Sequence, residues 1–176
     1  MTRVPGRPAP ETAVGEVAGA GPNDCSFDGF YRAQSDRVYR ALALTLRDPE
    51  LAREATDEAM ARACARWRAV GGMENPGGWV YRVGLNWATS WWRKRSREQP
   101  LHPERDETAA PDQQASVALA ALRELPLPQR AVVVCRVLLD LSTVDTAELL
   151  GLPEGTVKSR LARALGALRA TLTEED

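Results

Sequence analysis

The stretch STVDTAELLGLPEGTVKSRLARALGAL, residues Ser142–Leu168, predicts two short helices joined by a tight turn. Ser142 with Asp145 three residues later has the pattern of a capping box, which marks the start of a helix. Gly151 suits the left-handed conformation that ends many helices, and Pro153 suits the first turn of the next one. We therefore expect a helix-turn-helix over these residues.

The sizes of the residues around Gly151 fit the crossing of two helices. Ala147 lies four residues before Gly151 and Val157 six residues after it, which places a small residue at the crossing and an apolar residue facing back. The same run, residues 151–159, resembles a phosphate-binding loop, but no glycine directly precedes Lys158. We therefore expect the turn to serve the helix crossing and not a nucleotide.

The second of these helices is basic, with four basic residues and no acidic one between Gly155 and Arg169. Leu161, Leu165 and Leu168 recur at helical spacing and are expected to face the core. A basic amphipathic helix is often simply solvated on its polar face, and here the turn spacing favours DNA binding instead. The side chains expected to face solvent or DNA are Thr156, Lys158, Ser159, Arg160 and Arg163.

Composition narrows the class of protein. The 176 residues carry a formal net charge of −1, three cysteines and one histidine. The widely separated Cys25, Cys64 and Cys135 argue against a disulfide framework, and His102 alone excludes most zinc sites and catalytic triads. No apolar run is long enough to cross a bilayer. We expect a cytoplasmic protein without a metal, a cofactor or an enzymatic activity.

The N-terminal part changes character at Phe27. Residues 1–26 are rich in Pro, Gly and Ala and are predicted to form a disordered tail. From Phe27 to Leu46 the apolar residues, Tyr31 among them, recur as in an amphipathic helix.

A second helix is expected to start at Asp48-Pro49, because proline suits the first helical position. Its apolar stripe is expected to end at Cys64 and Trp67. The opposite face is charged, and such a face is either solvated or a binding surface for another protein. The charged residues are Arg53, Glu54, Asp57, Glu58 and Arg62.

A third helix is predicted from Asn75-Pro76 to about Arg95. The residues spaced to face the core are Val80, Gly84, Trp87 and Trp91. The opposite side combines cations, which suit phosphates, with an amide that can hydrogen-bond base edges, so it is predicted to be a nucleic-acid surface. Its residues are Trp79, Arg82, Asn86, Thr89 and Arg93, continued by Lys94, Arg95 and Arg97. The spacing leaves open whether Trp79 and Trp92 pack in the core or stack on a base.

Residues 98–115 are acidic and contain three prolines, so they are predicted to be an extended linker. A short helix over 116–124, a very apolar helix starting near Arg130 and the helix-turn-helix would then form a four-helix unit. We therefore expect an all-α protein with two small helical domains, residues 27–97 and 116–176, joined by a flexible linker.

These segments resemble a known family in the right order. The run LPLPQRAVVVCRVLLDLSTVDTAELLGLPEGTVKSRLARAL resembles the C-terminal DNA-binding domain, region 4, of bacterial RNA polymerase sigma factors of the extracytoplasmic-function (ECF) group. FDGFYRAQSDRVYRAL, LAREATDEAMARACARW and WVYRVGLNWATSWWRKR resemble the helices of that family's N-terminal domain, region 2. The resemblance extends from Phe27 to Leu172.

The resemblance implies a subunit that directs core RNA polymerase to promoters. Core polymerase would be bound through its beta-prime clamp helices and beta flap, the former by Arg53, Asp57, Glu58 and Arg62. The minus-10 element would be recognised and melted by Trp79, Arg82, Asn86, Arg93, Lys94 and Arg95, with the loop Gly71–Gly78 holding a flipped base. The minus-35 element would be bound by Thr156, Lys158, Ser159, Arg160 and Arg163. An anti-sigma factor is a further candidate partner.

The chain departs from the family pattern at Thr143 and Thr146, where larger side chains are common, so the first helix of the motif is expected to pack less firmly. An alternative function is that of a regulator which binds a duplex operator without polymerase, as a dimer on a palindromic site. A nuclease or nucleotide-binding enzyme is a third candidate, although the sequence lacks a carboxylate cluster at metal spacing.

Overall fold

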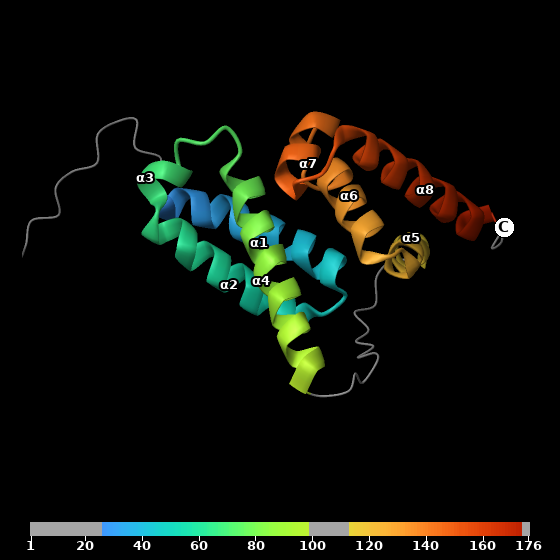
Figure 1. The fold of residues 1–176 in the computed structure, drawn as a ribbon, viewed down its shortest axis with the longest axis horizontal. Helices are drawn as coiled ribbons and strands as arrows, with labels where there is room; N and C mark the ends of the chain where they lie inside the picture. Colours follow the sequence, from blue (N-terminus) through green and yellow to red (C-terminus); the bar gives the residue numbers. More distant parts are fainter. Residues whose placement is uncertain (1–25, 99–112, 174–176) are drawn as a thin grey trace, which may run out of the picture.

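The computed structural model describes residues 26–98 and 113–173, which form eight helices and no strand (Figure 1). Residues 1–25 of the predicted tail 1–26 and nearly all of the predicted linker lie outside these residues. Ser26 belongs to α1 as its N-cap, where its hydroxyl oxygen accepts a hydrogen bond from the Gly29 N–H at 3.3 Å. The helices are α1 (Phe27–Leu46), α2 (Pro49–Ala65), α3 (Trp67–Val70), α4 (Pro76–Glu98), α5 (Gln113–Glu124), α6 (Leu127–Val137), α7 (Thr143–Leu150) and α8 (Glu154–Thr173). None of the helices in the described ranges is long and apolar enough to cross a membrane.

The starts of the N-terminal helices follow the predicted caps. The Asp48 side chain accepts a hydrogen bond from the backbone N–H of Leu51 at 2.9 Å, and Pro49 occupies the first helical position of α2. The Asn75 side chain accepts from the backbone N–H of Gly78 at 2.7 Å at the start of α4. These bonds satisfy N–H groups that have no partner inside the helix, so the local sequence fixes where α2 and α4 begin.

Helices α1, α2 and α4 pack around one core, and Gly84 allows their close approach. A Cβ atom at Gly84 would lie 2.8 Å from Leu42 Cδ1 and 3.0 Å from the backbone oxygen of Ala55. Any side chain at this position would therefore push α4 away from α1 and α2. The one-turn helix α3, which the sequence did not predict, places the Trp67 ring 4.9 Å from the Phe30 ring at one end of this core.

The helix-turn-helix has the predicted local geometry. The Ser142 side chain accepts from the Asp145 N–H and the Asp145 side chain accepts from the Ser142 N–H, both at 3.1 Å, so the capping box is complete. Gly151 ends α7 with φ 65°, in the left-handed region. Ala147 and Val157 are buried together at the crossing of α7 and α8. The predicted motif is confirmed.

Thr146, one of the departures from the family pattern, is fully buried in α7. Its hydroxyl oxygen has no hydrogen-bond partner among the described residues. A buried hydroxyl without a partner costs free energy. The expectation that α7 packs less firmly than in the family stays a prediction.

Several expectations about single residues and boundaries are wrong. The side chains of Tyr31, Cys64 and Leu165 are exposed although the periodicity placed them in the core. Tyr31 is 43 % exposed and Leu165 is 39 % exposed. Glu98 and residues 113–115 are helical, so the predicted linker 98–115 is shorter at both ends. Hydrophobic periodicity alone misplaces residues at the edge of an apolar stripe, where a rotation of a few tens of degrees decides burial.

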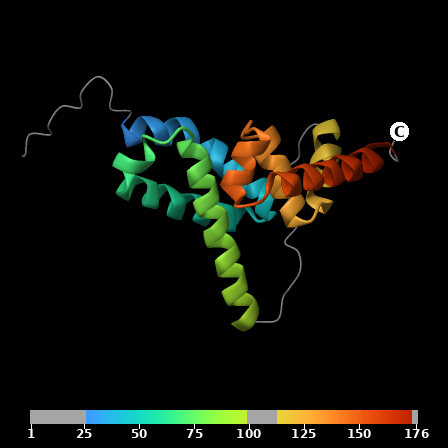
Figure 2. The same cartoon turned by 45° about the horizontal axis from the view of Figure 1, so that its top comes forward.

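The two helical units pack against each other, which the sequence did not predict. Figures 1 and 2 show α6 and α7 beside α1 and α4. Ala131, Val134, Cys135 and Leu141 of the C-terminal unit are buried in the same core as Val38, Leu42 and Tyr81 of the N-terminal unit. Within the described residues, the molecule is therefore one packed body built from two helical units.

Candidate nucleic-acid interface

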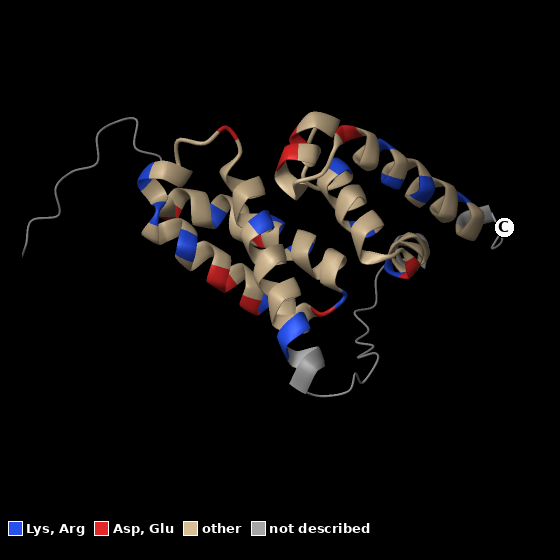
Figure 3. Ribbon diagram, viewed as in Figure 1, with Lys and Arg blue, Asp and Glu red and all other residues tan. Residues whose placement is uncertain are grey.

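The predicted minus-35 residues lie on α8, directly after the turn. Val157 and Ala164 are buried and fix which side of α8 faces its own unit. Helical spacing places four of the predicted residues side by side on the surface of α8, with Ser159 opposite the buried side and Arg160 at its border. They are Thr156, Ser159, Arg160 and Arg163, of which Arg163 is exposed and the other three are half-buried. Figure 3 shows basic residues along α8.

Lys158 lies apart from that face. Its spacing places it on the other flank of α8, where its Nζ atom lies 3.8 Å from a carboxylate oxygen of Glu154. This ion pair is exposed, so it contributes little to stability and is easily exchanged for a phosphate. The structure therefore separates Lys158 from the four residues with which the sequence grouped it.

By helical spacing, Trp79, Arg82, Asn86 and Arg93 share one side of α4, and Lys94 lies at its edge. The opposite side of α4 is buried through Val80, Tyr81, Gly84, Leu85 and Ala88. Arg82, Asn86, Arg93 and Lys94 are exposed, and Arg93 also donates to the Ser90 hydroxyl at 3.3 Å. The side chain of Arg95 lies outside what the structure describes, as does that of Arg97.

The four tryptophans of α4 all pack in part against the core. Trp79, Trp87, Trp91 and Trp92 are half-buried against the shared core cluster. The Trp79 side chain packs in part against the core, although helical spacing places it on the same side of α4 as Arg82 and Asn86. Trp79 therefore lies at the edge between core and surface. Trp92 is spaced on the core side, which assigns it to packing.

The loop before α4 is organised by the helix start. The Asn75 side chain caps α4, and a Cβ atom at Gly78 would lie 2.7 Å from Asn75 Nδ2. Met73 and Glu74 are exposed. The placing of a flipped base in this loop stays a prediction.

The predicted polymerase-binding residues lie on the exposed side of α2. The Arg62 guanidinium pairs with the Glu58 carboxylate at 2.8 Å, one helical turn away. The Arg53 guanidinium lies 5.2 Å from the centre of the Tyr39 ring of α1. Asp57 is exposed beside them. The structure thus brings the four predicted residues together on one mixed-charge surface.

The Arg82 side chain links the two predicted DNA surfaces. Its Nη1 atom donates to the backbone oxygen of Glu148 at 3.2 Å, in the last turn of α7. An arginine predicted to contact the minus-10 element is therefore bound to the first helix of the helix-turn-helix. No pattern in the sequence indicates this contact.

Sequence reasoning also missed a buried polar cluster between the units. The Tyr81 hydroxyl and the Thr45 hydroxyl lie 2.8 Å apart, and Thr45 donates to the backbone oxygen of Ala41 at 2.8 Å. Burial raises the pKa of the Cys135 thiol to about 12 and raises the pKa of Tyr81 well above its usual value. Both groups are therefore neutral at pH 7 and serve packing.

Arg130 is the charged member of this buried region. Its guanidinium donates to the backbone oxygens of Thr45 at 2.7 Å, Arg123 at 2.9 Å and Leu125 at 2.6 Å. Burial lowers the pKa of Arg130 to about 10, so it remains charged at pH 7. The sequence signal for this role was weak, since Arg130 appeared only as the start of an apolar helix.

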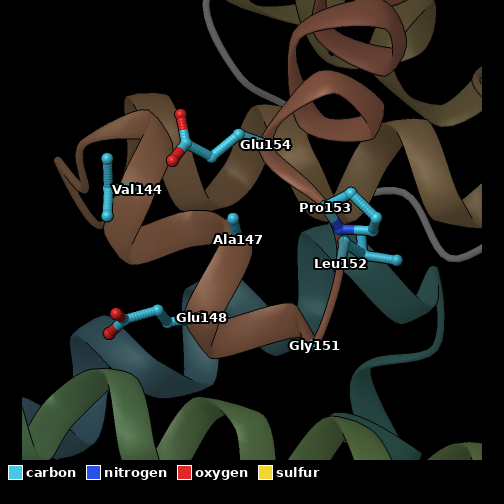
Figure 4. Close-up of a pocket in the computed structure, with 7 residues that line it drawn as sticks. All are labelled: Val144, Ala147, Glu148, Gly151, Leu152, Pro153 and Glu154. Atoms are coloured by element: carbon cyan, nitrogen blue, oxygen red, sulfur yellow. The ribbon is translucent and has the colours of Figure 1, made fainter.

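A solvent-open hollow of about 490 Å³ lies at the turn of the motif (Figure 4). The carboxylates of Glu148 and Glu154 line it, together with apolar side chains such as Val144. Its negative charge is unsuited to phosphate. The basic face of α8 is therefore the better candidate for contact with DNA.

The fold and these surfaces define an all-α DNA-binding protein, with a helix-turn-helix unit packed on a second helical unit. The family model "Sigma-70, region 4" matches residues 117–168. The chain is 36 % identical over 155 residues to the RNA polymerase sigma-E factor of Streptomyces coelicolor, covering 85 % of this chain and 88 % of the relative. It is 34 % identical to the ECF RNA polymerase sigma factor SigM of Mycobacterium tuberculosis, covering 84 % and 77 %.

The solved structures agree on the fold. The sigma factor RpoE of Bartonella quintana, solved in complex with the anti-sigma factor NepR, matches with a TM-score of 0.69 and 21 % identity over 84 % of this chain and 96 % of that one.

The sequence identity to the two relatives shows the family: the chain belongs to the ECF family of RNA polymerase sigma factors. This membership overturns the alternative of a regulator that acts without polymerase.

Proposed function

We propose that the two basic surfaces divide promoter recognition between them. The face Thr156, Ser159, Arg160 and Arg163 of α8, with Lys158 on its flank, contacts the minus-35 element as duplex. The exposed side of α4, with Arg82, Asn86, Arg93 and Lys94, and Trp79 at its edge, contacts and melts the minus-10 element. Arg95, whose side chain lies outside what the structure describes, belongs to the same proposed contact. The observation that supports this assignment is the polar surface of α8, the second helix of the helix-turn-helix, directly after the turn at Gly151.

The remaining surfaces fit the partners of a sigma factor. The mixed-charge face of α2, Arg53, Asp57, Glu58 and Arg62, binds the clamp helices of core polymerase, and the C-terminal unit binds the beta flap. An anti-sigma factor is a further partner, since the similar RpoE of Bartonella quintana was solved with one. The chain carries no catalytic activity of its own and acts in the cytoplasm, at the nucleoid when bound to polymerase.

Reconstitution with core polymerase tests this function. Purified protein added to core enzyme and genomic DNA fragments is expected to give transcripts that start at a discrete subset of promoters. Protein alone is expected to bind DNA weakly and in a strongly salt-dependent manner, because phosphate contacts dominate such binding. Transcripts no different from those of core enzyme alone would contradict the function.

The Arg160→Ala substitution tests the minus-35 assignment. We expect it to weaken holoenzyme binding to promoters with an intact minus-35 element by about 1–3 kcal/mol, as for loss of a bidentate base contact. Filter binding or footprinting on matched promoters measures the effect. The control promoter carries a scrambled minus-35 element, on which wild type and variant should bind alike. Equal weakening on both promoters would instead assign Arg160 to a phosphate.

A further inference from the structure

Glu154 interrupts the basic character of α8. It is the first residue of the helix and the one acidic residue between 154 and 169. Its side chain is 51 % exposed, and a carboxylate oxygen lies 3.8 Å from the Nζ atom of Lys158, whose side chain is 68 % exposed. Phosphates repel a carboxylate, so an acid on a helix that contacts DNA opposes binding unless it gains a partner there.

Local stability gives only a small reason for Glu154. A negative charge in the first turn of a helix is favourable, and so is a glutamate four residues before a lysine. Both effects are weak where the charges are exposed, because water and salt screen them. A neutral residue would therefore cost the fold little, and the carboxylate is better explained by what α8 contacts.

The Glu154 side chain pairs with Lys158 and also lines the hollow at the turn of the motif (Figure 4). Glu148 of α7 lines the same hollow, and the described residues that line it include no lysine or arginine. The pair with Lys158 thus neutralises a carboxylate in acidic surroundings. Transfer of Lys158 to a phosphate would leave that carboxylate without its cation.

Glu154 is also placed to reach base edges. In a helix-turn-helix the N-terminal residues of the second helix contact the bases in the major groove. Gly155, the next residue, is exposed, and a Cβ atom there would meet nothing within 4 Å. No side chain at Gly155 holds DNA away from the start of α8, and Thr156 of the proposed minus-35 contact follows directly.

A carboxylate in the major groove discriminates between bases. It only accepts hydrogen bonds, and its preferred partner there is the amino group at N4 of cytosine. Without such a donor the carboxylate loses water and gains nothing, which weakens the complex. Contacts from lysine and arginine to phosphates, by contrast, strengthen binding to any sequence.

We propose that Glu154 is a specificity-determining residue of α8, which accepts a hydrogen bond from a cytosine of the minus-35 element and weakens binding to DNA without that cytosine. This role rests on the proposed contact of α8 with the minus-35 element. At a matching element the cytosine amino group replaces Lys158 as the partner of the carboxylate, and the ammonium group turns to a phosphate. On other DNA the same exchange leaves Glu154 without a partner, so it is unfavourable.

The affinity of the free, full-length protein for a short duplex without promoter elements tests the effect on unmatched DNA. Fluorescence anisotropy at several salt concentrations gives the binding constant and its salt dependence. Glu154→Gln keeps the size of the side chain and removes its charge. We expect it to bind about fivefold more tightly at physiological salt, with a slope of log K against log salt concentration steeper by up to about 0.9, since Lys158 is free to neutralise one more phosphate.

Glu148→Gln is the matched control for this measurement. It removes the same charge from the same hollow but leaves the pair of Glu154 with Lys158 intact. Its salt slope should equal that of the wild type. A role of Glu154 in helix stability alone would change thermal unfolding and leave the salt slope unchanged.

Holoenzyme binding to a set of promoters, each with one base pair of the minus-35 element replaced, tests the base contact. We expect loss of one cytosine to weaken binding of the wild-type holoenzyme at least about fivefold, the lower limit for a direct base contact. Glu154→Gln should prefer adenine at that position, because glutamine both accepts from adenine and donates to it. Preferences at the other positions should stay as in the wild type.

Equal salt slopes in the wild type and Glu154→Gln, or an equal change of slope in Glu148→Gln, would overturn the proposal. Base preferences in the minus-35 element that Glu154→Gln leaves unchanged would overturn it as well. Failure of every form to distinguish promoters from other DNA would refute the proposed function and with it the base contact, while the salt series would still show whether Glu154 restrains Lys158.

Discussion

Replacement of Arg130 by methionine should lower the free energy of unfolding by about 2–4 kcal/mol. The reason is that the backbone oxygens that accept hydrogen bonds from Arg130 lose their charged donor. Arg130 is 4 % exposed, and its guanidinium donates to the ends of both α1 and α5. Methionine keeps much of the apolar volume but donates no hydrogen bond. Relief of the buried charge offsets part of the loss, as the lowered pKa of Arg130 indicates.

Urea denaturation followed by circular dichroism measures this change. Arg40→Met is the matched control, because Arg40 is exposed on α1 and surface substitutions usually change stability by no more than about 0.5 kcal/mol. If Arg130→Met and Arg40→Met unfold at the same urea concentration as the wild type, Arg130 does not hold these helix ends in solution.

Replacement of Gly84 by valine should cost at least about 2 kcal/mol of stability, because extra atoms in a packed core force side chains and backbone to move. A Cβ atom there would lie 3.0 Å from the backbone oxygen of Ala55, which cannot move without shifting α2. Removal of a helical glycine recovers less than about 1 kcal/mol, so the clash is the larger effect.

Gly166→Val in α8 is the matched control for this substitution. A Cβ atom at Gly166 would meet nothing within 4 Å, so valine should leave stability almost unchanged or raise it slightly. The pair separates helix propensity from packing, and thermal unfolding of both variants provides the measurement. Equal effects at the two positions would show that α4 does not require close approach at Gly84.

The helix-turn-helix was predictable in detail because its determinants are local. A capping box depends on residues three apart, and the left-handed Gly151 depends on the absence of its own side chain. The same holds for the starts of α2 and α4 at Pro49 and Pro76. The periodicity also placed Arg82, Asn86 and Arg93 on the exposed side of α4, as the structure shows.

The edges of the apolar stripes were less predictable, because burial there depends on neighbours from other helices. Cys64 and Leu165 have suitable spacing and are still exposed, whereas Tyr81 is fully buried although the spacing did not select it. Tyr81 is buried because Thr45 of α1 and Cys135 of α6 meet it from two other helices. No pattern within α4 contains that information.

The sequence of α6 contains one signal for the contact between the units. The segment RAVVVCRVLLDL is apolar on more than one side, and such a helix is buried on more than one side. That pattern indicates a second contact for α6 but does not identify the surface that covers it.

The sequence by itself determined the helices, their caps, the helix-turn-helix and the two basic surfaces, because these depend on residues within a few positions of one another. Only the tertiary structure decided that the two units pack together and that Arg37, Arg82 and Arg130 close helix ends across the contact. Such bonds join residues 66 to 101 positions apart. Every residue has a backbone carbonyl, and each carbonyl accepts equally well from any arginine. The type of residue to which a carbonyl belongs therefore does not indicate which arginine will bind that carbonyl.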